Sequence, residues 1–76
     1  MQREQAITWV REAILQHEYE APGSYTLEST WKELGVDSLS LVEICTIIEE
    51  KAGSTITANL NDIRTVGDLV NLVEQL

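Results

Sequence analysis

The 76-residue sequence predicts an all-α domain, a small four-helix bundle with three main helices and one short one. Two observations favour this class: apolar residues recur at helical spacing in three separate stretches, and no strand-like alternation competes with them. Turn-forming and capping residues also separate these stretches. With 43% hydrophobic residues the chain is expected to fold, and residues 1–76 are expected to form one domain.

The first helix is expected over about residues 3–18. Apolar residues recur along it at helical spacing, which places them on one face directed at the core. These residues are Ile7, Val10 and Ile14, with Ala6 and Ala13 beside them.

A long loop is expected to follow. The segment Glu20-Ala21-Pro22-Gly23-Ser24 breaks regular structure through its proline and glycine, and the loop then runs to about Val36. This length in so small a domain indicates a packed loop rather than a linker. Its expected anchors are Tyr25, Leu27, Trp31 and Leu34.

The second helix is expected after Asp37, with Gly53 as its C-terminal cap. The sequence allows two starts for this helix, one turn apart. Asp37 can accept a backbone N–H from Leu39 or Ser40, whereas Ser40 with Glu43 would form a capping box. The buried stripe of this helix has the spacing i, i+3, i+4, i+7 and i+11. It consists of Leu41, Ile44, Cys45, Ile48 and Ala52.

The last third of the chain predicts a short helical turn and a final helix. The turn is expected within Ile56–Ile63, with Leu60 and Ile63 facing inward. Thr65-Val66-Gly67-Asp68 is typical of a capping box, with aspartate in place of the usual glutamate. The apolar positions of the final helix are Val66, Leu69, Val70 and Val73.

Composition excludes several classes of function. The balance of 13 acidic against 5 basic residues gives a net charge of -8, which repels nucleic acid and anionic membranes and attracts basic protein patches. Acidity that serves only solubility is the alternative. Neither a membrane span nor a signal peptide is expected. Cys45 is the single cysteine, so no internal disulfide or multi-cysteine metal site is expected, and a reducing cytoplasm fits best. The protein is also expected to be a monomer.

The stretch Leu34-Gly35-Val36-Asp37-Ser38-Leu39-Ser40-Leu41-Val42-Glu43-Ile44 contains the candidate functional residue, Ser38. It places this serine at the N-terminus of an amphipathic helix, where unpaired N–H groups and the helix dipole favour an attached phosphate. Taken alone, Asp-Ser-Leu is also a common helix cap. A hydrolase triad of Ser38, His17 and an aspartate is disfavoured, because the chain has no Gly-x-Ser-x-Gly motif and little room for a pocket.

This stretch, with the small helical frame around it, resembles the modification site of acyl carrier proteins, and the resemblance covers nearly the whole chain. It implies that Ser38 carries a 4′-phosphopantetheine arm, transferred from coenzyme A by a phosphopantetheinyl transferase. The thiol of the arm would hold acyl groups as thioesters for fatty-acid or polyketide synthesis. The protein would then be a carrier on which other enzymes act, and not itself an enzyme.

The second helix has an acidic face opposite its buried stripe. About 100° per residue places Leu39, Glu43, Thr46, Ile47 and Glu50 there. Two apolar residues among acids are typical of a binding surface, although a plain solvated face is the alternative. Glu49 and Glu50 lie against the helix dipole, which also suggests recognition by basic side chains. The resemblance assigns partner contacts to Asp37, Glu43 and Glu49, with Leu39 and Val42 as apolar contacts for acyltransferases, ketosynthases and other acyl-processing enzymes.

Some residues depart from the family pattern. Ser40 stands where fatty-acid carriers often have an acid, and Thr46 where they often have methionine. Ile56-Thr57-Ala58-Asn59 replaces the usual Ile-Pro-Asp-Glu. Val36 stands where peptidyl carriers commonly have a second glycine, so the acyl class is preferred to a peptidyl or aminoacyl carrier of a nonribosomal peptide pathway. An unmodified acidic interaction domain stays open as a second class of function.

Overall fold

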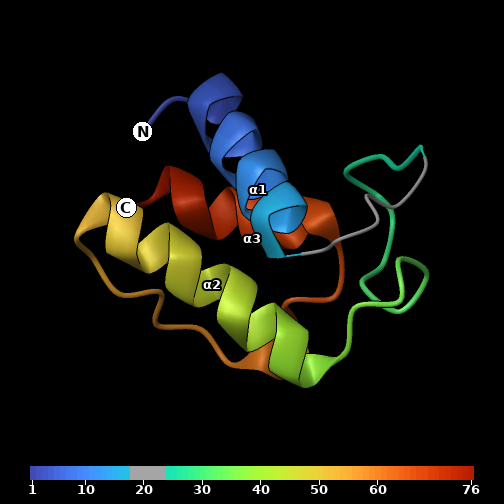
Figure 1. Ribbon diagram of the computed structural model, residues 1–76. Coiled ribbons are helices and arrows are strands. Elements are labelled where there is room, and N and C mark those ends of the chain that lie inside the picture. Colours follow the sequence, from blue (N-terminus) through green and yellow to red (C-terminus); the bar gives the residue numbers. More distant parts are fainter. Residues whose placement is uncertain (18–23) are drawn as a thin grey trace.

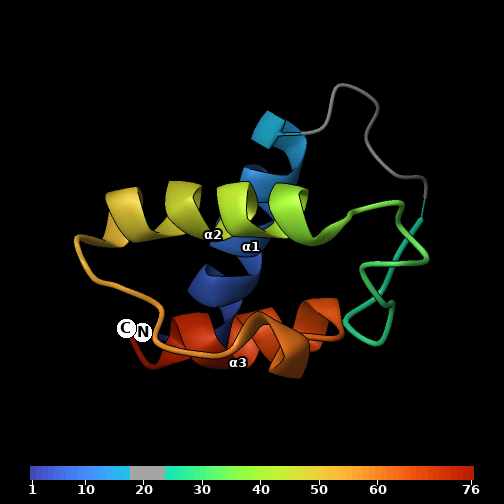
Figure 2. The ribbon, with the colours of Figure 1, turned by 90° about the horizontal axis from the view of Figure 1, so that it is seen from below.

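The computed structural model describes residues 1–17 and 24–76. Its helices are α1 (Arg3–His17), α2 (Ser38–Ala52) and α3 (Val66–Glu74), with a short 3-10 helix, η1 (Leu60–Asp62), before α3. The predicted all-α class is confirmed. Figure 1 shows α1 lying across α2 and α3. In the view from below, α2 and α3 extend in similar directions at two levels, and α1 crosses from one level to the other (Figure 2).

Asp37 fixes the start of α2. Its carboxylate accepts a hydrogen bond from the backbone N–H of Ser40 at 2.8 Å, so the helix begins at Ser38 and not one turn later. At the other end Gly53 adopts a left-handed φ of 69°, and its N–H donates to the carbonyl of Glu49 at 2.8 Å. Both predicted caps are therefore confirmed, and they fix the two ends of α2.

The capping box of α3 is formed as predicted. The N–H of Asp68 donates to Thr65 Oγ1 at 3.1 Å, and the N–H of Thr65 donates to Asp68 Oδ2 at 3.0 Å. The N–H of Arg64 donates to the same carboxylate oxygen at 3.0 Å. The Thr65 backbone N–H is the main reason that the pKa of Asp68 is lowered. The carboxylate thus stabilises the entry to α3 in its charged form.

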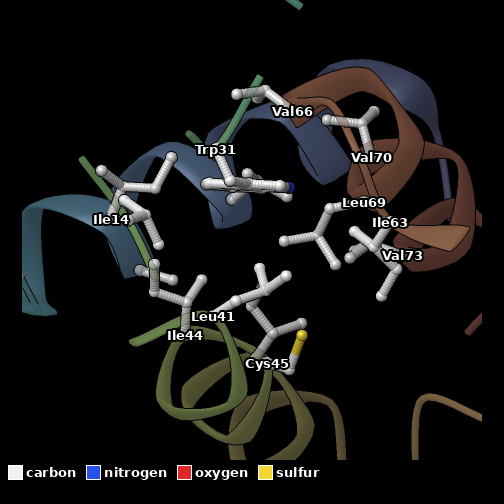
Figure 3. Close-up of a cluster of buried hydrophobic side chains, with 14 of the residues drawn as sticks. Ile14, Trp31, Leu41, Ile44, Cys45, Ile63, Val66, Leu69, Val70 and Val73 are labelled. Atoms are coloured by element: carbon white, nitrogen blue, oxygen red, sulfur yellow. The ribbon is translucent and has the colours of Figure 1, made fainter. Parts of the chain in front are cut away.

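The core lies where the three helices meet, and it contains nearly all of the predicted apolar positions. Figure 3 shows side chains from α1, α2 and α3 pointing toward one another, with the indole of Trp31 among them. On α1 the centre of the buried face is shifted: Ala6 and Ala13 are buried, whereas Ile7 is half-buried. The reason is that α1 packs against both α2 and α3, and small side chains allow close approach. The buried predicted residues are Val10, Ile14, Leu41, Ile44, Cys45, Ile48, Ile63, Val66, Leu69, Val70 and Val73. Ala52 and Leu60 are half-buried.

Residues 24–36 form a packed loop, as predicted. Trp31 is 4% exposed, while Tyr25, Leu27 and Leu34 pack half-buried against the core. Val36 is a further buried anchor that the sequence did not single out. Residue 18 and the predicted break at 20–23 lie outside the described residues.

Backbone hydrogen bonds attach this loop to the entry of α3. The N–H of Val66 donates to Ser29 O at 3.0 Å, and the N–H of Gly67 donates to Leu27 O at 2.7 Å. A Cβ on Gly67 would lie 2.9 Å from that carbonyl oxygen, so the close approach requires glycine. An isolated bridge pairs Thr30 with Thr65, and the described residues contain no strand. The loop is thereby held beside the start of α3.

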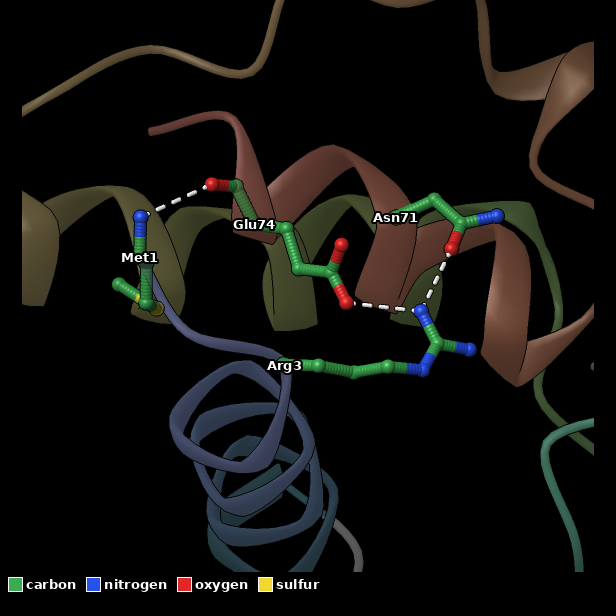
Figure 4. Close-up of polar contacts among 4 residues, drawn as sticks. All are labelled: Met1, Arg3, Asn71 and Glu74. Carbon is green, nitrogen blue, oxygen red and sulfur yellow. Dashed lines mark hydrogen bonds and ion pairs between the residues drawn. The ribbon is translucent and has the colours of Figure 1, made fainter.

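The N-terminal segment is attached to the end of α3. The amino group of Met1 donates to Glu74 O at 3.0 Å (Figure 4). Arg3 Nη1 donates to Asn71 Oδ1 at 2.9 Å and lies 2.7 Å from Glu74 Oε1. These exposed contacts join α1 to α3 at the end of α3 remote from the loop. In the described part of the chain no helix is both long and apolar enough to cross a membrane.

Candidate functional site

Ser38 is the first residue of α2 and is exposed. The chain reaches it through Gly35, whose φ of 74° is in the left-handed region, and through the buried Val36. The N–H of Val36 donates to Trp31 O at 2.9 Å. A buried anchor two residues before the serine and a cap one residue before it therefore hold the Ser38 backbone at the mouth of the helix.

The electrostatics at this helix start favour an anion on Ser38. The first intrahelical hydrogen bond is from the N–H of Leu41 to Asp37 O at 2.9 Å, and the Ser40 N–H donates to the Asp37 carboxylate, which leaves the N–H groups of Ser38 and Leu39 without an intrahelical acceptor. The Ser40 backbone N–H is the main cause of a lowered pKa at Asp37, and the Ser40 hydroxyl and the charge of His17 lower it further. Asp37 thus acts as a charged cap while the Ser38 hydroxyl is accessible.

An open hollow of about 320 Å³ adjoins Ser38. Its walls come from three segments: the end of the packed loop, the first turn of α2, and the stretch from η1 to Arg64. The hollow combines apolar surface with two basic side chains. Its lining residues are Thr30, Trp31, Lys32, Val36, Asp37, Ser38, Leu41, Leu60, Asn61, Ile63 and Arg64. Sequence reasoning did not find this feature, because its walls meet only in the folded chain.

Most of the residues predicted for the partner face are exposed on α2. Leu39 is 69% exposed and Val42 is 40% exposed, so these two form its apolar part. Ile47 differs, because it is half-buried and packs against the core. Among the polar positions Asp37, Glu43, Thr46 and Glu50 are exposed, and Glu49 is half-buried.

Glu43 connects the face to α1. Its Oε2 lies 3.0 Å from Nδ1 of His17, the last residue of α1. The sequence indicated only that His17 suits a helix C-terminus. No spacing rule joins residues 17 and 43, so this pair became visible only in the tertiary structure.

Glu49 has a role within the chain that the sequence did not reveal. Its Oε2 accepts the backbone N–H of Ile56 at 2.6 Å, which ties the segment after α2 back to the helix. An acid near a helix C-terminus opposes the dipole, and this hydrogen bond supplies a reason for it. Glu50, its neighbour, is exposed.

Cys45 belongs to the core, as predicted. Burial raises the pKa of its thiol to about 11, and the charge of Glu49 acts in the same direction. The thiol is therefore protonated at neutral pH and is a poor nucleophile.

Comparison with known proteins identifies the family. Residues 8–73 match the phosphopantetheine attachment site family. The acyl carrier protein of Streptococcus pneumoniae serotype 4 is 41% identical over 66 residues, which cover 87% of this chain and 88% of that protein. The chain belongs to the acyl carrier protein family. The acyl carrier protein of Exiguobacterium sibiricum is 34% identical over 76 residues, covering 97% of this chain and 96% of the other.

A plant relative also matches. Acyl carrier protein 1, chloroplastic, of Hordeum vulgare is 46% identical over 52 residues, which cover 67% of this chain and 35% of that protein. The prosthetic group of an acyl carrier protein is a covalently attached phosphopantetheine. The region around Ser38 fits such a group, because an exposed hydroxyl stands at a helix N-terminus beside an open hollow.

Proposed function

We propose that Ser38 is the attachment point of the phosphopantetheine arm and that the protein serves fatty-acid synthesis. Polyketide synthesis is the alternative pathway. The observation that carries this assignment is the exposed position of Ser38 as the first residue of α2. The occurrence of relatives in bacteria and a chloroplast favours the fatty-acid pathway. When bound, the arm supplies a thiol that holds acyl groups as thioesters.

The residues around Ser38 have separate tasks in this proposal. Asp37 caps the helix, so that Ser38 is its first residue. The first-turn N–H groups that have no intrahelical acceptor favour the phosphate, since the helix N-terminus carries partial positive charge. Val36 anchors the approach from the core side. The chain thus supplies a rigid base for a mobile arm. The proposed compartment of the protein is the cytoplasm.

The attachment point is tested by Ser38→Ala, with Ser40→Ala as the matched control. Each variant is incubated with a phosphopantetheinyl transferase and coenzyme A, and intact mass is measured. We expect the arm on the natural protein and on Ser40→Ala, but not on Ser38→Ala, while circular dichroism shows unchanged helix content. Modification of the Ser38→Ala variant would overturn the assignment, and a natural protein that is never modified would favour an unmodified interaction domain.

We further propose that the exposed face of α2 binds the transferase, acyltransferases and ketosynthases through basic patches on those enzymes. Leu39 and Val42 supply the apolar contact, and the surrounding acids supply the charge. Charged rims mainly accelerate encounter, whereas apolar centres mainly hold the complex. The proposed contact residues are Asp37, Leu39, Val42, Glu43, Thr46, Ile47, Glu49 and Glu50.

The face is tested by Glu43→Lys, with Glu28→Lys in the packed loop as a control of equal charge change. We expect Glu43→Lys to slow association with partner enzymes at low salt, and the loss to shrink as salt rises. Leu39→Ala should weaken the complex with little dependence on salt. If Glu43→Lys and Glu28→Lys have equal effects, the face acts only through its contribution to net charge.

A further inference from the structure

The hollow beside Ser38 concentrates positive charge in an acidic protein. Lys32 and Arg64 are two of only five basic residues in the chain, and both line this hollow together with Ser38. Arg3 and Lys51 form ion pairs with acids elsewhere on the surface, and the charge of Arg64 also acts on Asp68, which lies outside the lining of the hollow. Two cations on the walls of one hollow, in a chain of net charge -8, indicate a preferred site for an anion.

The backbone holds these two cations on neighbouring walls. The N–H of Trp31 donates to Arg64 O at 3.2 Å, so the residue before Lys32 is bonded directly to Arg64. The side chain of Arg64 is in turn oriented by a 3.4 Å hydrogen bond from its Nε to Asn61 O. Lys32 belongs to the loop and Arg64 to the entry of α3, so the site exists only when the loop is packed.

The charges around the hollow favour an anion attached to Ser38. The lining includes one carboxylate, that of Asp37, and its oxygen is engaged with the Ser40 N–H. The two cations outnumber it. A phosphodiester on the Ser38 hydroxyl would be covalently fixed beside the hollow, so it would reach the cations without losing freedom of translation. Such a group carries one negative charge, and charge-assisted hydrogen bonds from lysine and arginine suit phosphate oxygens.

We propose that Lys32 and Arg64 bind the phosphodiester of the arm and so seat the first part of the arm in this hollow. The inference rests on the proposed function of Ser38 and adds two residues that position its prosthetic group. It also predicts the direction in which modification changes the stability of the fold. A further negative charge placed beside two cations stabilises the fold, whereas the same charge without them increases self-repulsion.

A cycle of melting temperatures tests this proposal. The shift on modification is measured for the natural protein, for Lys32→Gln/Arg64→Gln, and for Arg11→Gln/Lys51→Gln, which removes the same charge away from the hollow. We expect modification to raise the melting temperature of the natural protein and of the control by roughly 2–8 °C at low salt. In Lys32→Gln/Arg64→Gln the increase should vanish, and 1 M NaCl should remove it from the natural protein and from the control.

Intact mass separates this inference from the proposed function. If all three proteins are fully modified and their melting shifts are equal, the cation site is refuted while the assignment of Ser38 stands. If the natural protein is never modified, both fail. A second measurement needs no variant: between unmodified and modified protein, amide shifts should change at Lys32, Asn61 and Arg64. Changes confined to Ser38 and its chain neighbours would overturn the proposal.

Discussion

Reversing the charge of Glu49 should destabilise the fold, whereas the same change at Glu50 should not. Glu49 Oε2 accepts the N–H of Ile56 at 2.6 Å in a half-buried position, and Glu50 is exposed. A lysine at position 49 has no acceptor to offer, so the Ile56 N–H loses its partner and its segment loses an attachment to α2. The two neighbours therefore form a pair with the same charge change that differs in this hydrogen bond and in the burial that goes with it.

The magnitude follows from the hydrogen bond and its partial burial. A hydrogen bond to a charged group contributes about 1.5–3 kcal/mol, and partial exposure brings this toward about 1–2 kcal/mol. A cation near the helix C-terminus returns about 0.3–1 kcal/mol in either variant. Glu49→Lys should therefore lower the free energy of unfolding by about 1 kcal/mol, or roughly 4–8 °C in melting temperature. Glu50→Lys should be neutral or slightly stabilising, because the net charge of -8 becomes smaller in magnitude.

The assay is urea unfolding followed by circular dichroism, with Glu49→Gln as a third variant that retains an oxygen acceptor. Glu49→Gln should lie between the natural protein and Glu49→Lys. If Glu49→Lys and Glu50→Lys unfold at the same urea concentration, the Ile56 contact contributes nothing and the reasoning fails. If Glu49→Lys also loses partner binding, its lower stability must be taken into account before the loss is assigned to the partner face.

Four other outcomes follow from the core, the caps and the charges. Ile44→Ala should cost about 2–5 kcal/mol in urea unfolding, because Ile44 is fully buried; a cost below 1 kcal/mol would contradict its place in the core. Thr65→Ala should lower the free energy of unfolding by about 0.5–2 kcal/mol. Because the pKa of Asp68 is lowered, the capping box should stabilise α3 fully above pH 3.8 and lose strength as the pH falls below it. Asp68→Asn should abolish this pH dependence. Because the pKa of Cys45 is raised to about 11, its contribution to stability should hold below pH 9.0 and decline as the pH rises toward 11. Thiol labelling of the folded protein should be slow at pH 7, and a labelling rate that is unchanged on unfolding would count against burial. Added NaCl should raise the melting temperature by screening the net charge of -8, and a constant value would mean that the acids are already compensated.

Local sequence determined the elements of this fold and most of their ends. Helix caps depend on residues within one turn of each other, so Gly53 and the Thr65–Asp68 box were readable from the sequence, whereas the structure decided between Asp37 and a Ser40–Glu43 box at the start of α2. Apolar spacing likewise depends on one helix at a time, which is why the buried positions of α3 were all predicted. The position of Ser38 at a helix start followed from the same local rules.

Tertiary structure decided every feature that joins distant segments. The shift of the buried face on α1 depends on how α1 crosses two other helices, and periodicity carries no information on that crossing. The Glu43–His17 pair and the Glu49–Ile56 hydrogen bond depend on chain reversals of 26 and 7 residues, for which no spacing rule exists. The hollow with Lys32 and Arg64 needs the loop, α2 and the entry of α3 together. The sequence by itself therefore determined the helices and the candidate serine, and packing alone decided which side chains surround that serine.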